Sequence, residues 1–343
     1  MTQEIHECQM VYLLVHPNER DETAVTHQPI TPRKGIPYFQ PIDISVQLLE
    51  AFNLQLEGVE VSVQPQIYDG HTRIEQCIFT FSHPLSSTAV GRKERLENAL
   101  EQTLLTPEKL KDELWEGYSI LIFDLDLPRP TDFVAEHAPL LAQLLRSQAE
   151  PFSEEEVEQT LISRVQYAAN DLIVTDWGGA IMLSPYGDDQ VDIELFKIGS
   201  YQLLRYRLLD KRIETRLRSF QVALERRLRF RPLTSRQEIQ MLVAERLTYL
   251  LDFERIEQDL LLIGDWYTAQ LYHTIIDELY LDDWKTIVKN KLENLEKVMQ
   301  IVVDNLSGSW SHYFDMVELV GWFVLLVGYF VLFYLDVITA VLP

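Results

Sequence analysis

The pattern of apolar and polar positions changes near the middle of the chain. Up to about residue 185, short apolar runs rich in β-branched and aromatic residues predict strands, and apolar residues at helical spacing predict helices between them. The predicted strands are 10–16, 59–67, 75–82 and 118–125, and the predicted helices are 92–105, 131–146 and 153–161. Residues 171–185 predict a hairpin, because two apolar runs flank a turn with adjacent glycines. We therefore expect an α+β domain over 1–185.

Helical spacing dominates the rest of the chain. We expect helices over 190–230, 235–281 and 283–335, with Pro232 and the step at 281–283 as breaks. The region 190–315 is thus predicted to be a stalk of long antiparallel helices with coiled-coil character.

The third of these helices carries a heptad pattern. Apolar residues recur at alternating steps of four and three, at Val288, Leu292, Leu295, Met299, Val302 and Leu306. The same phase continues through Tyr313, Met316, Val320 and Phe323. Two interpretations stay open, because the stripe could face the preceding helix of its own chain or form an oligomeric coiled coil.

The C-terminal residues predict a membrane anchor. Residues 319–335 are uncharged and strongly apolar, which is typical of a transmembrane helix. Glu318 and Asp336 would mark the membrane boundary, with Trp322 and Tyr334 as interfacial aromatic anchors. The alternative is a buried core helix. We expect a single C-terminal transmembrane helix within 316–343, in contact with the lipid bilayer.

The N-terminus and the cysteines indicate the compartment. No basic segment followed by an apolar stretch and a cleavage site opens the chain, so a secretory signal is not expected. The two cysteines, Cys8 and Cys77, fit a reducing environment. These features predict a tail-anchored protein of a bacterial inner membrane or another cytoplasm-facing membrane, with the bulk of the chain cytoplasmic.

Charge is unevenly distributed within a total of −23, which by itself disfavours binding to DNA. Residues 197–236 carry twelve basic and three acidic side chains, whereas 252–283 carry nine acidic and one basic. The residues that define this basic helix are Arg205, Arg207, Arg212, Arg216, Arg226, Arg227 and Arg229. It could pair with the acidic segment in a hairpin, or it could bind anionic lipid or RNA.

Recognisable catalytic signatures are missing from the sequence. It contains no phosphate-binding glycine loop, no dinucleotide-binding glycine motif and no zinc-protease HExxH motif. We therefore predict no catalytic residue, no cofactor and no metal site, and do not expect an enzyme.

Four segments resemble a known family. The stretches NDLIVTDWGGAIMLSP, YQLLRYRLLDKRIE, LLIGDWYTAQLYHTIIDEL and DDWKTIVKNKLENLEKV are similar to an uncharacterised family of bacterial membrane proteins. That family has the layout of the required-for-meiotic-nuclear-division/Sad1-interacting-factor proteins. The resemblance covers about half of the chain. It implies an α/β N-terminal part, long helices and one C-terminal span, and no assigned enzymatic activity.

The hairpin and the following helix offer a structural contact. Asp176 and Trp177 lie at the predicted turn, and Arg207 and Asp210 lie three apart on a helix. These four residues could form a latch between the hairpin and the helix.

Together these features predict a single-span membrane protein of unknown biochemical activity. We expect it to be a self-associating interaction or scaffold module, and hence a homo-oligomer, that faces the cytoplasm. The alternative is an oligomeric channel or transporter in which each protomer contributes one pore helix.

Overall fold

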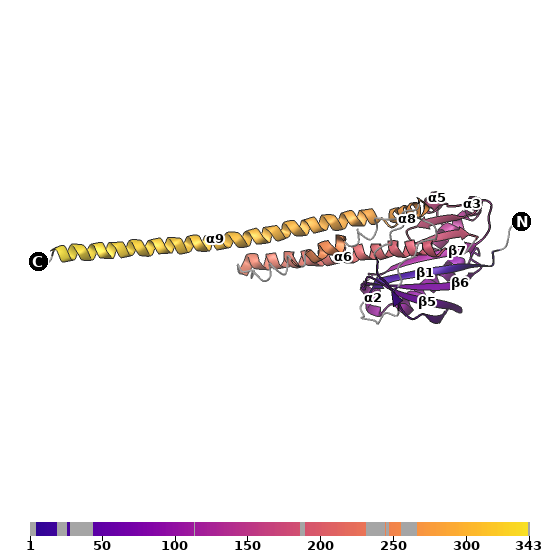
Figure 1. The fold of residues 1–343 in the computed structure, drawn as a ribbon, viewed down its shortest axis with the longest axis horizontal. Coiled ribbons are helices and arrows are strands. Elements are labelled where there is room, and N and C mark those ends of the chain that lie inside the picture. Colours follow the sequence, from indigo (N-terminus) through magenta and orange to yellow (C-terminus); the bar gives the residue numbers. More distant parts are fainter. Residues whose placement is uncertain are drawn as a thin grey trace. The chain divides into compact units, whose positions relative to one another are not determined.

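The computed structural model describes residues 5–18, 26–27, 44–112, 114–185, 189–230, 244, 247–254 and 266–341. The chain divides into two compact units. Unit 1 comprises Met1–Lys211 and Asp252–Val288, and unit 2 comprises Arg212–Leu251 and Lys289–Pro343. Two of the three boundaries between the units fall inside long helices, α6 (Gln190–Phe230) and α9 (Leu281–Val341), and the third falls between Leu251 and Asp252. Figure 1 labels both long helices.

Unit 1 is built on one large sheet. Its strand order among the described residues is β2-β3-β5-β6-β1-β7-β10-β9-β8, and β4 pairs with β5. The strands are β1 (Glu7–Pro17), β2 (Thr26–His27), β3 (Val46–Leu48), β4 (Phe52–Leu56), β5 (Val59–Tyr68), β6 (Thr72–Ser82), β7 (Glu116–Asp124), β8 (Arg164–Val165), β9 (Leu172–Asp176) and β10 (Gly179–Ser184). These neighbours pair antiparallel except β7 and β10, which are parallel. The segment that connects β7 with β10 contains three helices and the strands β8 and β9.

One face of this sheet forms an apolar core with short helices. Side chains alternate across a strand, so Cys8, Met10, Tyr12 and Leu14 of β1 share a face, as do Cys77, Phe79 and Phe81 of β6. The helices of this part are α1 (Ala89–Leu104), α2 (Pro107–Asp112), α3 (Pro130–Glu136), α4 (Ala138–Leu145) and α5 (Glu154–Thr160). The core includes residues of α1, α3 and α4.

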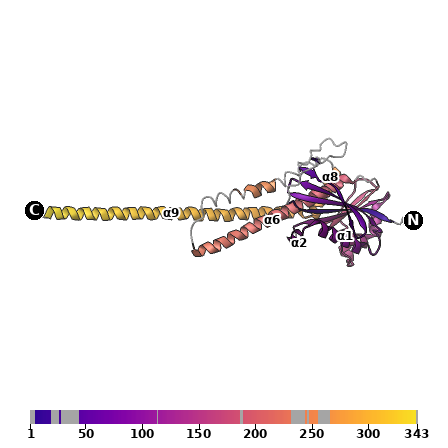
Figure 2. The same ribbon diagram turned by 90° about the horizontal axis from the view of Figure 1, so that it is seen from below.

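The opposite face packs against α6 and α8 (Trp266–Glu278) (Figure 2). Phe196 of α6 stacks on Tyr118 of β7 with 5.2 Å between ring centroids. A β-carbon added at Gly199 of α6 would lie 2.5 Å from Ile275 Cγ2, so a glycine is what lets α8 approach α6 this closely.

Several predicted elements are confirmed. The four predicted strands correspond to β1, β5, β6 and β7, and the predicted hairpin is β9–β10. The predicted helix at 153–161 is α5, and Ser153 caps it, because its side chain accepts a hydrogen bond from the Glu156 amide at 3.2 Å. The predicted helix at 131–146 is divided into α3 and α4, with Pro139 in the first turn of α4, where its missing N–H is tolerated.

Unit 2 contains the end of α6 and most of α9. Within it, Glu214 of α6 accepts a hydrogen bond from Arg218 at 2.6 Å and lies 3.6 Å from the Lys291 ammonium of α9. The hydrogen bond from Arg218 is the main cause that lowers the pKa of Glu214, and the two positive charges add to it. The α6 prediction of 190–230 is confirmed, and α9 begins next to the expected break at 281–283.

The predicted membrane span is wrong. Among the described residues, no helix combines the length and the apolar character that crossing a bilayer requires. The transmembrane anchor at 316–343, the tail-anchored layout and the membrane localisation are therefore corrected. The predicted fold class is corrected with them: the structure has an N-terminal sheet domain with helices, followed by C-terminal helices.

Candidate functional site

An apolar segment of α9 is the largest exposed apolar feature among the described residues. Within 316–332 the large apolar side chains have exposed fractions between 44% and 70%. A helix that is apolar on all its faces is normally buried, because exposed apolar surface leaves hydrophobic free energy unrealised. Two predicted membrane-boundary residues, Glu318 and Trp322, are exposed here. The side chains of Asp336 and Tyr334 lie outside the described ones.

The heptad residues lie in different environments along α9. Val288 is fully buried in unit 1, and Leu292 and Leu295 are buried in unit 2. The side chains of Met299, Val302 and Leu306 are outside the described ones. The role of the six residues as an interface therefore stays a prediction.

The basic helix is α6, and several of its cations contact acidic groups. Arg205 is buried, with its guanidinium 3.9 Å from the Asp252 carboxylate, and Arg207 pairs with Glu116 of β7. Burial is the main cause that raises the pKa of Glu116, and Arg207 opposes it. Arg212 and Arg216 make further polar contacts. The side chains of Arg226, Arg227 and Arg229 lie outside the described ones, so binding of lipid or RNA stays untested.

The hairpin tip is held by Arg146, a residue that the sequence pattern did not indicate. Arg146, which follows α4, donates from Nε to Asp176 Oδ2 at 2.9 Å and from Nη2 to Oδ1 at 3.3 Å, and it also pairs with Glu156. These bonds raise the pKa of Arg146, chiefly through Asp176. Trp177 is half exposed beside the same guanidinium, 5.9 Å from its ring centroid. Asp210 makes contacts of its own, and the proposed latch of Asp176 and Trp177 with Arg207 and Asp210 remains a prediction.

A closed polar network lies between α6 and the sheet. Lys197, almost fully buried, donates to Glu194 Oε1 at 2.6 Å and to Gln66 Oε1 at 3.2 Å. The Tyr68 hydroxyl donates to Glu194 Oε2 at 3.0 Å, and Gln66 donates to Gln76 at 3.2 Å. Burial lowers the pKa of Lys197, and the neighbouring Glu194 opposes that change. We call these residues the Lys197 network.

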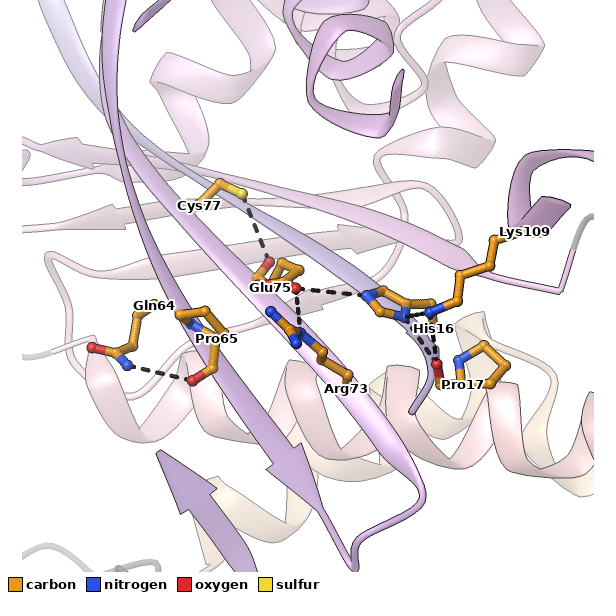
Figure 3. A network of polar contacts seen from close by, with 8 residues as sticks. All are labelled: His16, Pro17, Gln64, Pro65, Arg73, Glu75, Cys77 and Lys109. Carbon is orange, nitrogen blue, oxygen red and sulfur yellow. Dashed lines mark hydrogen bonds and ion pairs between the residues drawn. The ribbon is translucent and has the colours of Figure 1, made fainter. Parts of the chain in front are cut away.

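A second polar cluster lies on the opposite face of the sheet, because Glu75 shares a face with Cys77, whereas Gln66 pairs with Ile74 on the other face. Figure 3 shows this cluster. His16 of β1 and Glu75 of β6 are buried, with 3% and 2% of their surface exposed. Arg73 donates from Nε to Glu75 Oε1 at 2.5 Å, and Lys109 of α2 lies 3.0 Å from His16 Nδ1. His16 Nε2 and Glu75 Oε2 have no hydrogen-bond partner among the described residues. We call these four residues the His16 cluster.

The His16 cluster was not predicted from the sequence. One signal was present, because Glu75 stands at the inward position of a strand in step with Cys77, Phe79 and Phe81. A carboxylate in that register is a buried charge, which needs partners. The two cysteines are a different case. Burial raises the pKa of the Cys8 thiol to about 12 and also raises that of Cys77, so neither is a reactive thiolate at neutral pH.

Comparison with known proteins finds uncharacterised relatives. Residues 47–190 match the family described as the N-terminal domain of uncharacterized protein MJ0711. Uncharacterized protein MJ0711 of Methanocaldococcus jannaschii is 27% identical to this chain over 196 residues, which is 57% of the chain. The match covers 60% of the archaeal protein's length. No solved structure matches. These matches assign no activity, and they do not address the resemblance to the required-for-meiotic-nuclear-division/Sad1-interacting-factor layout.

Proposed function

We propose that this protein is a self-associating interaction module in which α9 packs against α9 of a second copy. The observation that carries the proposal is the exposure of the apolar segment 316–332. Removing a large apolar side chain from water stabilises an assembly by about 1.5–3 kcal/mol at best, and association costs offset part of that gain. A segment with many such side chains has enough surface to repay those costs.

The length of α9 favours a second copy as the partner. The part of α9 in unit 2, from Lys289 to Val341, is about 80 Å long at about 1.5 Å per residue. The part of α6 in the same unit, from Arg212 to Phe230, is only about 28 Å long. A helix of that length cannot cover α9, whereas another α9 has equal length and the same apolar spacing.

The heptad phase supports one particular face of α9 as the contact. Continued from the proximal residues, it runs through Met316, Val320, Phe323, Val327 and Phe330. Glu318, the charged residue within 316–332, falls on the opposite side of the helix. A parallel pairing in register brings identical apolar positions together and leaves this carboxylate in water.

Sedimentation equilibrium of the full chain tests the proposal. We expect an oligomeric wild type, and Phe323→Glu should shift it toward the monomer by placing a charge in the contact. Leu325→Glu is the matched control, because it adds the same charge to an exposed apolar position on the other side of the helix. A monomeric wild type, or equal effects of the two substitutions, would contradict the proposed contact.

A further inference from the structure

We propose that the outer edge of β4 pairs with β4 of a second copy of this chain and so joins the sheets of two molecules. This contact belongs to unit 1 and is separate from the proposed α9 contact, which belongs to unit 2. β4 pairs with β5, and no other strand of the described residues pairs with it. The edge of a sheet offers a row of backbone N–H and C=O groups to a further strand.

The turn that joins β4 to β5 determines which backbone groups of β4 point outward. Its two residues, Glu57 and Gly58, have φ angles of 50° and 79°, which are typical of a type I′ hairpin turn. Such a turn makes Leu56 a residue that hydrogen-bonds with β5. Hydrogen-bonded and non-hydrogen-bonded positions alternate along an antiparallel pair. The backbone N–H and C=O groups of Asn53 and Gln55 therefore point away from β5, toward the open edge.

A second β4 fits these outward groups when the two strands run antiparallel with Leu54 opposite Leu54. Asn53 of each copy then lies opposite Gln55 of the other, and each of these two pairs exchanges two backbone hydrogen bonds. Phe52 of each copy lies opposite Leu56 of the other, so apolar side chains meet on one face and amides on the other. β4 is thus complementary to itself in its backbone groups and in its side chains, which favours a second copy as the partner.

The charges around β4 are compatible with the same register. The strand itself, FNLQL, contains no charged residue and no proline, which are the residues that protect natural sheet edges against pairing. The flanking carboxylates of Glu50 and Glu57 fall opposite Gly58 and Ala51 of the second copy, and like charges are therefore not directly opposed. Phe52 is 38% exposed and would gain an apolar neighbour across the pair.

Sedimentation equilibrium of full-length Phe323→Glu separates this contact from that of α9. We expect a monomer–dimer equilibrium in which the dimer forms as the protein concentration rises, because a five-residue strand makes few contacts. Adding Asn53→Pro should raise the dissociation constant at least about tenfold, since each dimer loses two N–H donors that do not pair with β5. Asn53→Ala is the matched control. It loses the same side-chain hydrogen bond to Glu60 but keeps its N–H, and should leave the dissociation constant unchanged.

Cysteine cross-linking provides a readout that does not depend on how the proline variant folds. The α-carbons of a non-hydrogen-bonded antiparallel pair are about 4.5 Å apart, a distance that a disulfide spans. Leu54→Cys in the Phe323→Glu chain should therefore form a disulfide-linked dimer on air oxidation. Ser62→Cys, exposed on β5 and one strand away from the edge, is the control and should stay monomeric. The native Cys8 and Cys77 are buried and should not compete.

Three results would overturn the proposed pairing. Phe323→Glu could stay monomeric at every concentration, Asn53→Pro could associate as tightly as Asn53→Ala, or Ser62→Cys could cross-link as readily as Leu54→Cys. If Asn53→Pro loses the circular dichroism of the native fold, the cross-linking comparison alone decides.

Discussion

Two polar networks occupy opposite faces of the same sheet and differ in how completely their buried atoms are hydrogen-bonded. The Lys197 network joins an ammonium, a carboxylate, a phenol and two amides through bonds of 2.6–3.3 Å. The His16 cluster leaves one imidazole nitrogen and one carboxylate oxygen without a partner among the described residues. The two groups contain similar residue types at similar burial. Only the His16 cluster, however, has buried polar atoms without a hydrogen-bond partner among the described residues.

This difference in hydrogen bonding should affect how much each group of residues stabilises the fold. A complete buried network rigidifies the packing of α6 on the sheet, because each member holds its neighbours in place. A buried donor or acceptor without a partner costs about 1–3 kcal/mol. The Lys197 network is thus expected to contribute more to stability than the His16 cluster.

The largest expected effect is in the Lys197 network. Glu194→Leu removes the carboxylate that balances a buried ammonium, and the loss of unfolding free energy should be about 3 kcal/mol in urea denaturation. The double variant with Lys197→Met should lose less than Glu194→Leu alone, because no uncompensated charge is left. A single variant as stable as the wild type would show that the network does not stabilise the fold.

A smaller loss is expected for the phenol of the same network. Tyr68→Phe removes the donor to Glu194 at 3.0 Å and should cost about 1 kcal/mol of unfolding free energy. Tyr167→Phe is the control, because Tyr167 is 64% exposed and its change should be close to zero in the same denaturation experiment. Equal losses at the two tyrosines would argue against the contribution of the buried hydrogen bond.

The His16 cluster should tolerate a change that the Lys197 network does not. Glu75→Gln should cost less than about 1 kcal/mol of unfolding free energy, since the amide oxygen still accepts from Arg73 and Oε2 has no bond to lose. Urea denaturation of this variant and of Glu194→Leu compares the two losses of unfolding free energy directly. A loss at Glu75 as large as that at Glu194 would remove the distinction between the two faces.

The smallest effect is a dependence of stability on alkaline pH. Burial lowers the pKa of Lys197 below its usual 10.5, so between the two values the unfolded chain binds more protons than the folded one. Stability from this group therefore rises with pH through that window. The difference in unfolding free energy between wild type and Lys197→Met should shift in favour of the wild type as pH rises. A pH-independent difference would contradict the cause assigned to the shift.

The sequence predicted those elements whose formation depends on local pattern. Alternating apolar residues specified β1, β6 and β7, and the adjacent glycines specified the β9–β10 turn. Ser153 specified the start of α5, because a cap depends only on residues within one turn. The division of 131–146 into α3 and α4 was missed, although Pro139 was visible in the sequence.

The sites depended on contacts between distant segments. Arg146 meets Asp176 thirty residues later, and His16 meets Glu75 and Lys109 only because β1 pairs with β6 and α2 lies against the end of β1. The apolar content of 319–335 was evident from the sequence, but it predicted a membrane span that the described helices do not provide.

The sequence by itself determined the sheet-and-helix character of the chain and the continuity of α9, because these follow from spacing along one segment. The tertiary structure alone decided which buried charged groups have hydrogen-bond partners for their polar atoms and which do not. Hydrogen bonds form over about 3 Å, and only the packing of α6 on one face and α2 at the other sets those distances. For that reason the sequence alone did not show that Lys197 belongs to a complete hydrogen-bond network or that His16 and Glu75 keep buried atoms without a partner among the described residues.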